Sequence, residues 1–359
     1  MPEGKKKHKY LSILVRFLVA AVALYFAFRG EDIRKIGQVF LKLNWWIFAA
    51  ALVIYLISQL IFASRWYLLL WVQGIRISYS ATVRLMFLGL FYNNCLPSSV
   101  GGDVMRAWYV TKHTDKRLQA ALSVFVDRVI GLLGSILMAA GGYLLIPVKN
   151  RSAQQLGISY RNPTQIFTEH RKIILLVASV SIILIAGFAL TGKGRGLLRR
   201  WWMFVEEHGL RILRRVHESV RIYYNNKLAI CAAMLLTFLC QGVFIIGILL
   251  VGENIGVTAQ VKYYFIFFPI SWVIGSLPIS VGGAGVTEWW LKDVFVRVCG
   301  LTGELALVLA LIQRLLWIFG SLPGVVIHLV GAHLPGEPKH KSPLTVSEEF
   351  SVDYKSPVN

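Results

Sequence analysis

Four polar residues follow a break in an apolar stretch of the chain, in the order Ser98, Ser99, Asp103 and Arg106. A helix that starts near Val100 would point its free N–H groups and its positive dipole end at a neighbouring group, which suits a phosphate. Arg106 follows Asp103 by three residues, so the two side chains share one helix face. A guanidinium binds phosphate in bidentate fashion, and a nearby carboxylate positions it or competes for it. The pattern indicates an anion site, with a capping serine and a local Asp–Arg pair as the structural alternative.

The same break occurs twice. Residues 96–102 read LPSSVGG and residues 277–283 read LPISVGG, so six of seven positions repeat. Proline removes an N–H and stops a helix, whereas the two glycines allow close approach of a ligand or another helix. Interrupted apolar segments at matching places in two halves are typical of a transporter's binding site. Small and polar residues at both breaks are therefore further candidates for binding: Asn93, Asn94, Gly101, Gly102, Ser280, Gly282 and Gly283.

Four more charged residues lie inside or beside apolar runs, where an ionised side chain is costly and usually functional. Asp127 and Arg128 are adjacent, so on a helix they point about 100° apart and each needs its own partner. Arg314 has no acidic residue within a turn, which leaves Glu288, Asp103 or a lipid phosphate as its anion. Glu288 is expected to pair with an arginine of the other half or to carry a proton. Purely structural ion pairing is the alternative for Asp127, Arg128 and Arg314, and for Glu288 the alternative is a carboxylate held by the packing of Trp289 and Trp290 at an interface.

The residues typical of an enzyme or a metal site are not grouped in this sequence. The four cysteines, Cys95, Cys231, Cys240 and Cys299, have no metal-type spacing and lie in or beside apolar stretches, as small buried side chains do. No glycine-rich phosphate loop opens a soluble α/β unit, and no nucleophile has a visible partner base. We therefore expect no enzymatic activity, no cofactor and no metal.

The elements that must position these residues are membrane helices. The chain has 359 residues, of which 56% are hydrophobic and 16% charged, and a mean hydropathy of +0.61. Runs of about 20 apolar residues are long enough to cross a bilayer. Arg65, near the end of one run, is expected to extend to the lipid headgroups. We predict six spans, at 10–28, 45–71, 118–147, 172–191, 228–252 and 304–331.

Two broken segments, 80–110 and 261–296, lie between these spans and are read as re-entrant helix hairpins, because neither half of either segment is long enough to span. Lys and Arg are more frequent in the loops on the side of the N-terminus, so both termini are predicted to be cytoplasmic. The blocks 45–147 and 228–331 then form an inverted repeat whose two breaks meet near the bilayer midplane. The predicted fold class is an all-α integral membrane protein.

The remaining segments surround one membrane domain, residues 1–335. The linker 192–227 is basic and carries interleaved Trp, Leu and Ile, as expected of a segment that contacts anionic lipid headgroups. The tail 336–359 is polar and predicted to be disordered. The formal net charge of +20 follows the loops between apolar runs, which points to membrane topology and not to nucleic acid. A homo-oligomer is compatible with these features.

Four motifs together resemble a known family. They are NNCLPSSVGGDVMRAW (93–108), VDRVIGLLG (126–134), LPISVGGAGVTE (277–288) and QRLLWIFGSLPG (313–324). In this order they resemble the lysylphosphatidylglycerol synthase transmembrane-domain family, also described as flippase-like. The resemblance implies a polytopic inner-membrane protein that handles an anionic phospholipid, a polyprenyl-phosphate-linked lipid or a hopanoid-type lipid. Because only 28 residues follow the last predicted span, no soluble aminoacyltransferase domain is expected.

Three functions compete on these grounds. The first is a lipid translocase, with a polar path for a headgroup between the two hairpins. The second is a membrane-embedded lipid-modifying or glycolipid-modifying enzyme with Asp103 or Glu288 as acid or base. The third is a scaffold that docks a cytoplasmic lipid-synthesis enzyme on the linker 192–227. We expect the first, because no loop is large enough to supply a donor-binding domain.

Overall fold

The computed structural model describes most of the predicted membrane domain. The predicted span 172–191, nearly all of the linker 192–227, the tail 336–359, and the candidates Ser98 and Ser99 lie outside the described residues. The described residues are 3–96, 101–112, 114–145, 223, 225–277 and 279–331.

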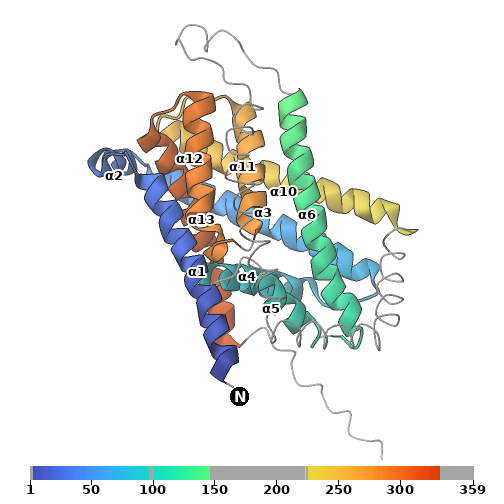
Figure 1. Cartoon of the computed structure of the whole chain (residues 1–359). Helices are drawn as coiled ribbons and strands as arrows, with labels where there is room; N and C mark the ends of the chain where they lie inside the picture. Colours follow the sequence, from blue (N-terminus) through green and yellow to red (C-terminus); the bar gives the residue numbers. More distant parts are fainter. Residues whose placement is uncertain are drawn as a thin grey trace, which may run out of the picture.

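The described residues form helices and no strands, which confirms the predicted all-α class (Figure 1). The first half contains α1 (Glu3–Phe28), α2 (Ile33–Leu41), α3 (Trp45–Val72), α4 (Tyr79–Cys95), α5 (Gly101–Val110) and α6 (Arg117–Leu145). The second half contains α10 (Lys227–Asn254), α11 (Val261–Ser276), the 3₁₀ turn η1 (Val281–Gly283), α12 (Val286–Cys299) and α13 (Gly303–Val330).

Four of these helices, α3, α6, α10 and α13, are long and apolar enough to cross a membrane. They correspond to four of the six predicted spans. The apolar parts of α1 and α11 are shorter, Arg16–Phe28 and Val261–Ser276. The number of spans beyond four, and the re-entrant course of the two broken segments, stay predictions.

Each break follows from its local sequence. Helix α4 ends at Cys95 and α11 at Ser276, in each case two residues before the proline of the repeated motif. In the second break, Gly282 and Gly283 have φ angles of 55° and 75°, a left-handed conformation that favours glycine. The chain then turns and continues as a short helix packed on the one before it, so α4 pairs with α5 and α11 with α12.

Buried aromatic rings hold the second pair of short helices together. Tyr264 and Phe267 on α11 pack edge-on against Phe295 on α12, with ring centroids 5.5 and 5.2 Å apart. Phe295 is fully buried. Such aromatic pairs add to the free energy of burial of their apolar surface. The packed aromatic rings of α11 and α12 therefore fix the position of the second break between these two helices.

The two halves contact each other reciprocally. Helices α3 and α10 pack side by side and antiparallel, since Asn44 lies beside Asn254 at one end and Ser58 beside Cys240 near the middle. Helix α4 of the first half packs on α13, and α11 of the second half packs on α6. Helices α6 and α13 run in opposite directions (Figure 1). This reciprocity is what the predicted inverted repeat leads us to expect, and the repeat itself stays a prediction.

The two breaks lie next to each other at the centre of the described helices. A Cβ atom added at Gly282, in the second break, would lie 2.9 Å from the carbonyl oxygen of Asn93, at the end of α4. On the first side, the N–H of Gly102 donates a hydrogen bond of 2.8 Å to Asn93 Oδ1. The glycines of both motifs thus allow backbone to approach within van der Waals contact.

Candidate functional site

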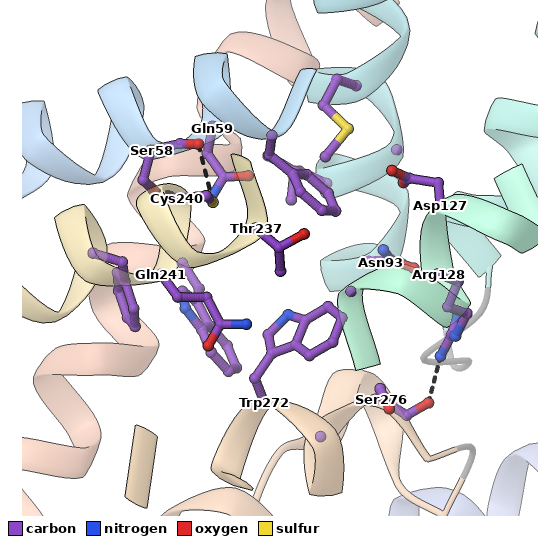
Figure 2. A pocket seen from close by; sticks show the side chains of 18 of the residues that line it. Ser58, Gln59, Asn93, Asp127, Arg128, Thr237, Cys240, Gln241, Trp272 and Ser276 are labelled. Atoms are coloured by element: carbon purple, nitrogen blue, oxygen red, sulfur yellow. Dashed lines mark hydrogen bonds between the residues drawn. The ribbon is translucent and has the colours of Figure 1, made fainter. Parts of the chain in front are cut away.

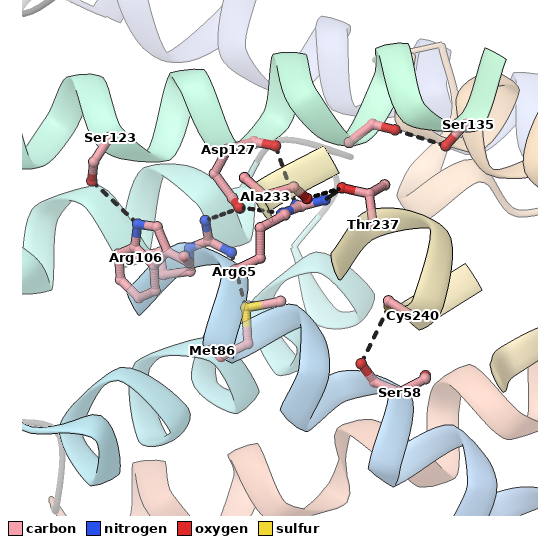
Figure 3. Close-up of polar contacts among 12 residues, drawn as sticks. Ser58, Arg65, Met86, Arg106, Ser123, Asp127, Ser135, Ala233, Thr237 and Cys240 are labelled. Atoms are coloured by element: carbon pink, nitrogen blue, oxygen red, sulfur yellow. Dashed lines mark hydrogen bonds and ion pairs between the residues drawn. The ribbon is translucent and has the colours of Figure 1, made fainter. Parts of the chain in front are cut away.

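A buried carboxylate shared by two arginines lies between α3, α5 and α6 (Figure 3). Asp127 Oδ1 accepts a hydrogen bond of 2.8 Å from Arg65 Nε, and Oδ2 accepts one of 2.7 Å from Arg106 Nη2. Arg65 also donates to Thr237 Oγ1 on α10 (3.0 Å) and to the carbonyl oxygen of Asp127 (3.2 Å). The three charged side chains are 1–3% exposed. One carboxylate for two guanidinium groups leaves this buried cluster with a positive charge.

Aromatic faces hold both guanidinium groups in place. Arg106 lies over the ring of Trp66 at 4.2 Å, and Arg65 over that of Phe62 at 4.1 Å. Cation–π contacts of this kind are strongest where water is excluded. The Trp66 indole is itself fixed by a hydrogen bond of 3.2 Å to Ser123 Oγ on α6. The guanidinium groups are therefore preorganised by side chains of the first half.

A second ion pair ties the first half to the second break. Arg128 Nη1 donates to the carboxylate of Asp103 on α5, and Nη2 donates to the carbonyl oxygen of Ser276 at 2.5 Å. Ser276 is the last residue of α11. One arginine of α6 thus joins α5 of the first short-helix pair to α11 of the second. The side chains of Arg128 and Asp103 are each about four-fifths buried.

A third ion pair supports the second break from within its own half. Arg314 Nε on α13 donates to Glu288 Oε1 at 2.5 Å, and Nη1 donates to the carbonyl oxygen of Gly282 at 2.8 Å. The other carboxylate oxygen of Glu288 accepts the N–H of Gly285 at 2.7 Å, which caps α12. Glu288 is 2% exposed. This cluster fixes the backbone of the break.

A cavity of about 200 Å³ lies where the two halves meet (Figure 2). Helices α3, α4, α5 and α6 supply one part of its lining, and α10, α11, η1 and α13 supply the other. Polar groups and indole rings share the wall, and Trp272 and Gln241 approach it from the second half. Apolar atoms nevertheless form most of the lining, as in the pockets that bind small molecules.

The structure brings seven of the thirteen described candidates to this cavity. Those that line it are Asn93, Asn94, Asp103, Arg106, Asp127, Arg128 and Gly282. The others support its wall from behind or lie elsewhere near the breaks: Gly101, Gly102, Ser280, Gly283, Glu288 and Arg314.

The pairing of Arg314 with Glu288, one of the three anions considered for that arginine, does form, whereas three other interpretations of the sequence are wrong. The local Asp103–Arg106 pair does not form, because each side chain pairs with a residue of α6. Glu288 pairs with Arg314 of its own half and not with an arginine of the other half. Arg65 does not extend to the headgroups, since it is 1% exposed and binds Asp127. Helix spacing shows which side chains share a face, but the partner depends on which neighbouring helix packs there.

Sequence reasoning missed several residues that line the cavity. Arg65 lies in the cluster because it donates to Asp127 on α6 and to Thr237 on α10. Gln241, also on α10, lines the same cavity. The signal that could have found Arg65 is the unbalanced charge at Asp127–Arg128, where a buried acid needs a cation other than its neighbour. The polar residues of α10 give no comparable signal, because Thr and Gln are also common in structural helix contacts.

Comparison with known proteins agrees with this architecture. The chain matches the family described as lysylphosphatidylglycerol synthase TM region over residues 13–324. It is 19% identical to a UPF0104 membrane protein of Pyrococcus horikoshii over 347 residues, which cover 89% of this chain and 96% of the relative. It is 23% identical to a UPF0104 membrane protein of Methanothermobacter thermautotrophicus over 355 residues, covering 91% and 97%. No solved structure matches the chain significantly.

The match includes both breaks, the ion pairs that line the cavity, and the Glu288–Arg314 pair that supports the second break. It also covers nearly all of the chain that the structure describes, apart from the first and last few residues. The apolar helices and the membrane proteins among its relatives show that this is a membrane protein. The chain belongs to the lysylphosphatidylglycerol synthase TM region family.

Proposed function

We propose that this protein is a lipid translocase of the cytoplasmic membrane, which moves an anionic lipid between leaflets by passing its headgroup through the central cavity. One observation carries the proposal. The Asp127 cluster holds two arginines against one carboxylate, is almost completely buried, and lines a cavity built by both halves of the chain. A buried excess of positive charge is costly unless an anion reaches it.

The arrangement favours movement of a lipid over its chemical modification. The two carboxylates considered as acid or base, Asp103 and Glu288, are each held by an arginine. Glu288 also accepts two hydrogen bonds that fix the start of α12, which suits a structural role. We therefore assign no catalytic residue. The linker 192–227 is proposed to contact anionic headgroups on the cytoplasmic side, next to the translocating domain.

Transbilayer movement of a labelled lipid tests this proposal. Purified protein in liposomes is expected to expose a fluorescent anionic phospholipid of the inner leaflet to dithionite, whereas protein-free liposomes protect it. Arg106→Gln is expected to lower the initial rate about ten-fold or more, because a hydrogen bond to a charged group contributes about 1.5–3 kcal/mol. Arg34→Gln, on the exposed surface of α2, is the matched control and is expected to leave the rate unchanged.

Two results would count against the proposal. If the wild-type protein moves no phosphatidylglycerol, phosphatidic acid or polyprenyl phosphate, the protein is not a translocase of anionic lipids. If it moves one of them and Arg106→Gln moves it equally fast, the headgroup does not pass the Asp127 cluster.

The orientation in the membrane is tested by labelling single cysteines. Helices α3 and α10 are antiparallel, so the loops that follow them lie at opposite ends of the described helices. In a variant without the four native cysteines, an impermeant maleimide added to intact cells is expected to label Thr258→Cys and not Arg76→Cys. Both positions are exposed. The reverse pattern would place both termini outside.

A further inference from the structure

The charged side chains that line the cavity do not balance. Within the described part of the chain, three arginines and two aspartates line it. Asp103 neutralises Arg128, and Asp127 is shared between Arg65 and Arg106. One positive charge is left over. In a buried site an anion of one charge compensates it, whereas a dianion or a cationic headgroup leaves a charge without a counter-charge.

Arg106 is the side chain that offers this charge to a guest. It is 3% exposed, and its Nε is buried without a hydrogen-bond partner. Its Nη1 faces only the thioether sulfur of Met86, at 2.9 Å, which is a weak acceptor. A buried guanidinium N–H without an acceptor is unfavourable by about 1–3 kcal/mol or more. An oxygen anion in the cavity would satisfy both nitrogens.

Neutral carboxamides line the same cavity as this cation. Gln59, Asn93, Asn94 and Gln241 all line the cavity, from α3, α4 and α10. Asn94 Nδ2 donates to a backbone carbonyl oxygen of α13 at 3.2 Å, and Gln241 Nε2 donates to a serine hydroxyl of α6 at 2.6 Å. Each of these two amides keeps its carbonyl oxygen as an acceptor for a guest. Acceptors without charge suit hydroxyl groups, because an ammonium group would also meet the excess positive charge.

An indole ring completes the wall on the side of the second half. Trp272 lies on α11 and faces the cavity between Gln241 and Arg128 (Figure 2). Indole faces pack well against the C–H groups of a polyol or sugar while the hydroxyls reach amides at the rim. The cavity therefore combines one net positive charge, neutral hydrogen-bonding groups and an aromatic surface.

We infer that the headgroup taken by this cavity is a monoanionic phosphodiester that carries a neutral, hydroxyl-bearing group such as glycerol, inositol or a sugar. This inference rests on the proposed function, because it names the cargo of the same cavity. It excludes as preferred cargo a lipid with a phosphomonoester, a diphosphate or an amine in its headgroup. The phosphodiester oxygens meet Arg106, and the hydroxyls meet the amides of Asn94 and Gln241.

Competitive lipid binding tests the inference without requiring movement. The full chain in detergent is exposed to equal amounts of dioleoyl phosphatidylglycerol, phosphatidic acid and phosphatidylethanolamine, and bound lipid is counted by native mass spectrometry. Phosphatidylglycerol is expected to exceed each of the others about ten-fold. Gln241→Leu is expected to reduce its excess over phosphatidic acid about five-fold, as for the loss of one hydrogen bond. Gln38→Leu, at an exposed position of α2, is the matched control.

The variants separate the charge from the hydroxyl contribution. Arg106→Gln is expected to remove the preference for phosphatidylglycerol over phosphatidylethanolamine. Equal or stronger binding of phosphatidic acid or phosphatidylethanolamine to the wild-type protein overturns the inference, as does an unchanged preference in Gln241→Leu. Movement of all anionic lipids at one rate with no selective binding leaves the translocase proposal intact and overturns the inference. Selective binding of phosphatidylglycerol without movement in liposomes supports the inferred headgroup and overturns the translocase proposal.

Discussion

Asp127→Asn is expected to lower the free energy of unfolding by about 3–5 kcal/mol, because it removes the only carboxylate between two buried guanidinium groups. Asparagine keeps the size of the side chain, so the loss reports on charge and not on a cavity. Arg65 and Arg106 are then left as two unpaired cations at 1% and 3% exposure. Unfolding of the purified protein in mixed SDS micelles measures the effect.

Two variants show whether burial of charge is the cause. Arg106→Gln leaves Asp127 paired with one arginine, and that pair has no net charge. The free energy of unfolding is therefore expected to fall clearly less in Arg106→Gln than in Asp127→Asn. Glu304→Gln removes a carboxylate from a pair with Lys35, whose side chain is 64% exposed, and is expected to cost about 0–1 kcal/mol. If the free energy of unfolding falls equally in all three variants, the buried Asp127 cluster contributes no more to stability than the exposed Lys35–Glu304 pair.

Gly102→Ala is expected to destabilise the protein by about 1–3 kcal/mol or more and to slow lipid movement at the same time. A Cβ atom at this position would lie 1.9 Å from the carbonyl oxygen of Gly89 and 2.8 Å from Asn93 Oδ1, so α5 must move away from α4. That movement displaces Arg106 from Asp127. The unfolding free energy and the dithionite assay measure the two effects.

The neighbouring glycine is the control for this variant. The nearest atoms to a Cβ atom at Gly101 are Cδ1 and Cβ of Leu96, at 2.9 and 3.0 Å, so a new rotamer and a shift of a few tenths of an ångström at Leu96 accommodate it. Gly101 is the first residue of α5, where helix propensity separates alanine from glycine less than the roughly 1 kcal/mol of a helix interior. Gly101→Ala is therefore expected to be near neutral. If Gly102→Ala is also neutral or stabilising, the close contact of α4 and α5 is not required.

The sequence predicted the plan of the fold because the relevant signals are local. Apolar length located α3, α6, α10 and α13 to within a few residues, and the repeated LPxSVGG motif located both interruptions. Helices α2 and α5 are short, so they depend on capping hydrogen bonds and on packing against other helices. In α2, for example, the Asp32 side chain accepts a hydrogen bond from the N–H of Arg34. The packing of α4 on α13 and of α11 on α6 joins segments far apart in sequence, which no local pattern encodes.

The site was predicted in part for the same reason. Asp127 and Arg128 were recognised as needing separate partners, since adjacent residues cannot face one direction. Their partners, Arg65 and Asp103, come from different helices, and only the packing of α3 and α5 on α6 identifies them. Arg65 was misplaced because its position near the end of a span suggested the interface, whereas α10 covers that part of α3.

The likeness of the two halves has a consequence for the direction of any transport. If the predicted inverted repeat holds, the backbone of the two units looks the same from either side of a membrane, so it gives transport no direction. Two kinds of feature can make one side unlike the other: segments outside the units, such as α1 and α2, and residues that differ between the units. Asp127 precedes Arg128 in the first unit, and Gln313 precedes Arg314 in the second. Such side chains set how tightly a headgroup binds from each leaflet, whereas one-way movement also requires an energy source, because a carrier without one only equilibrates its cargo.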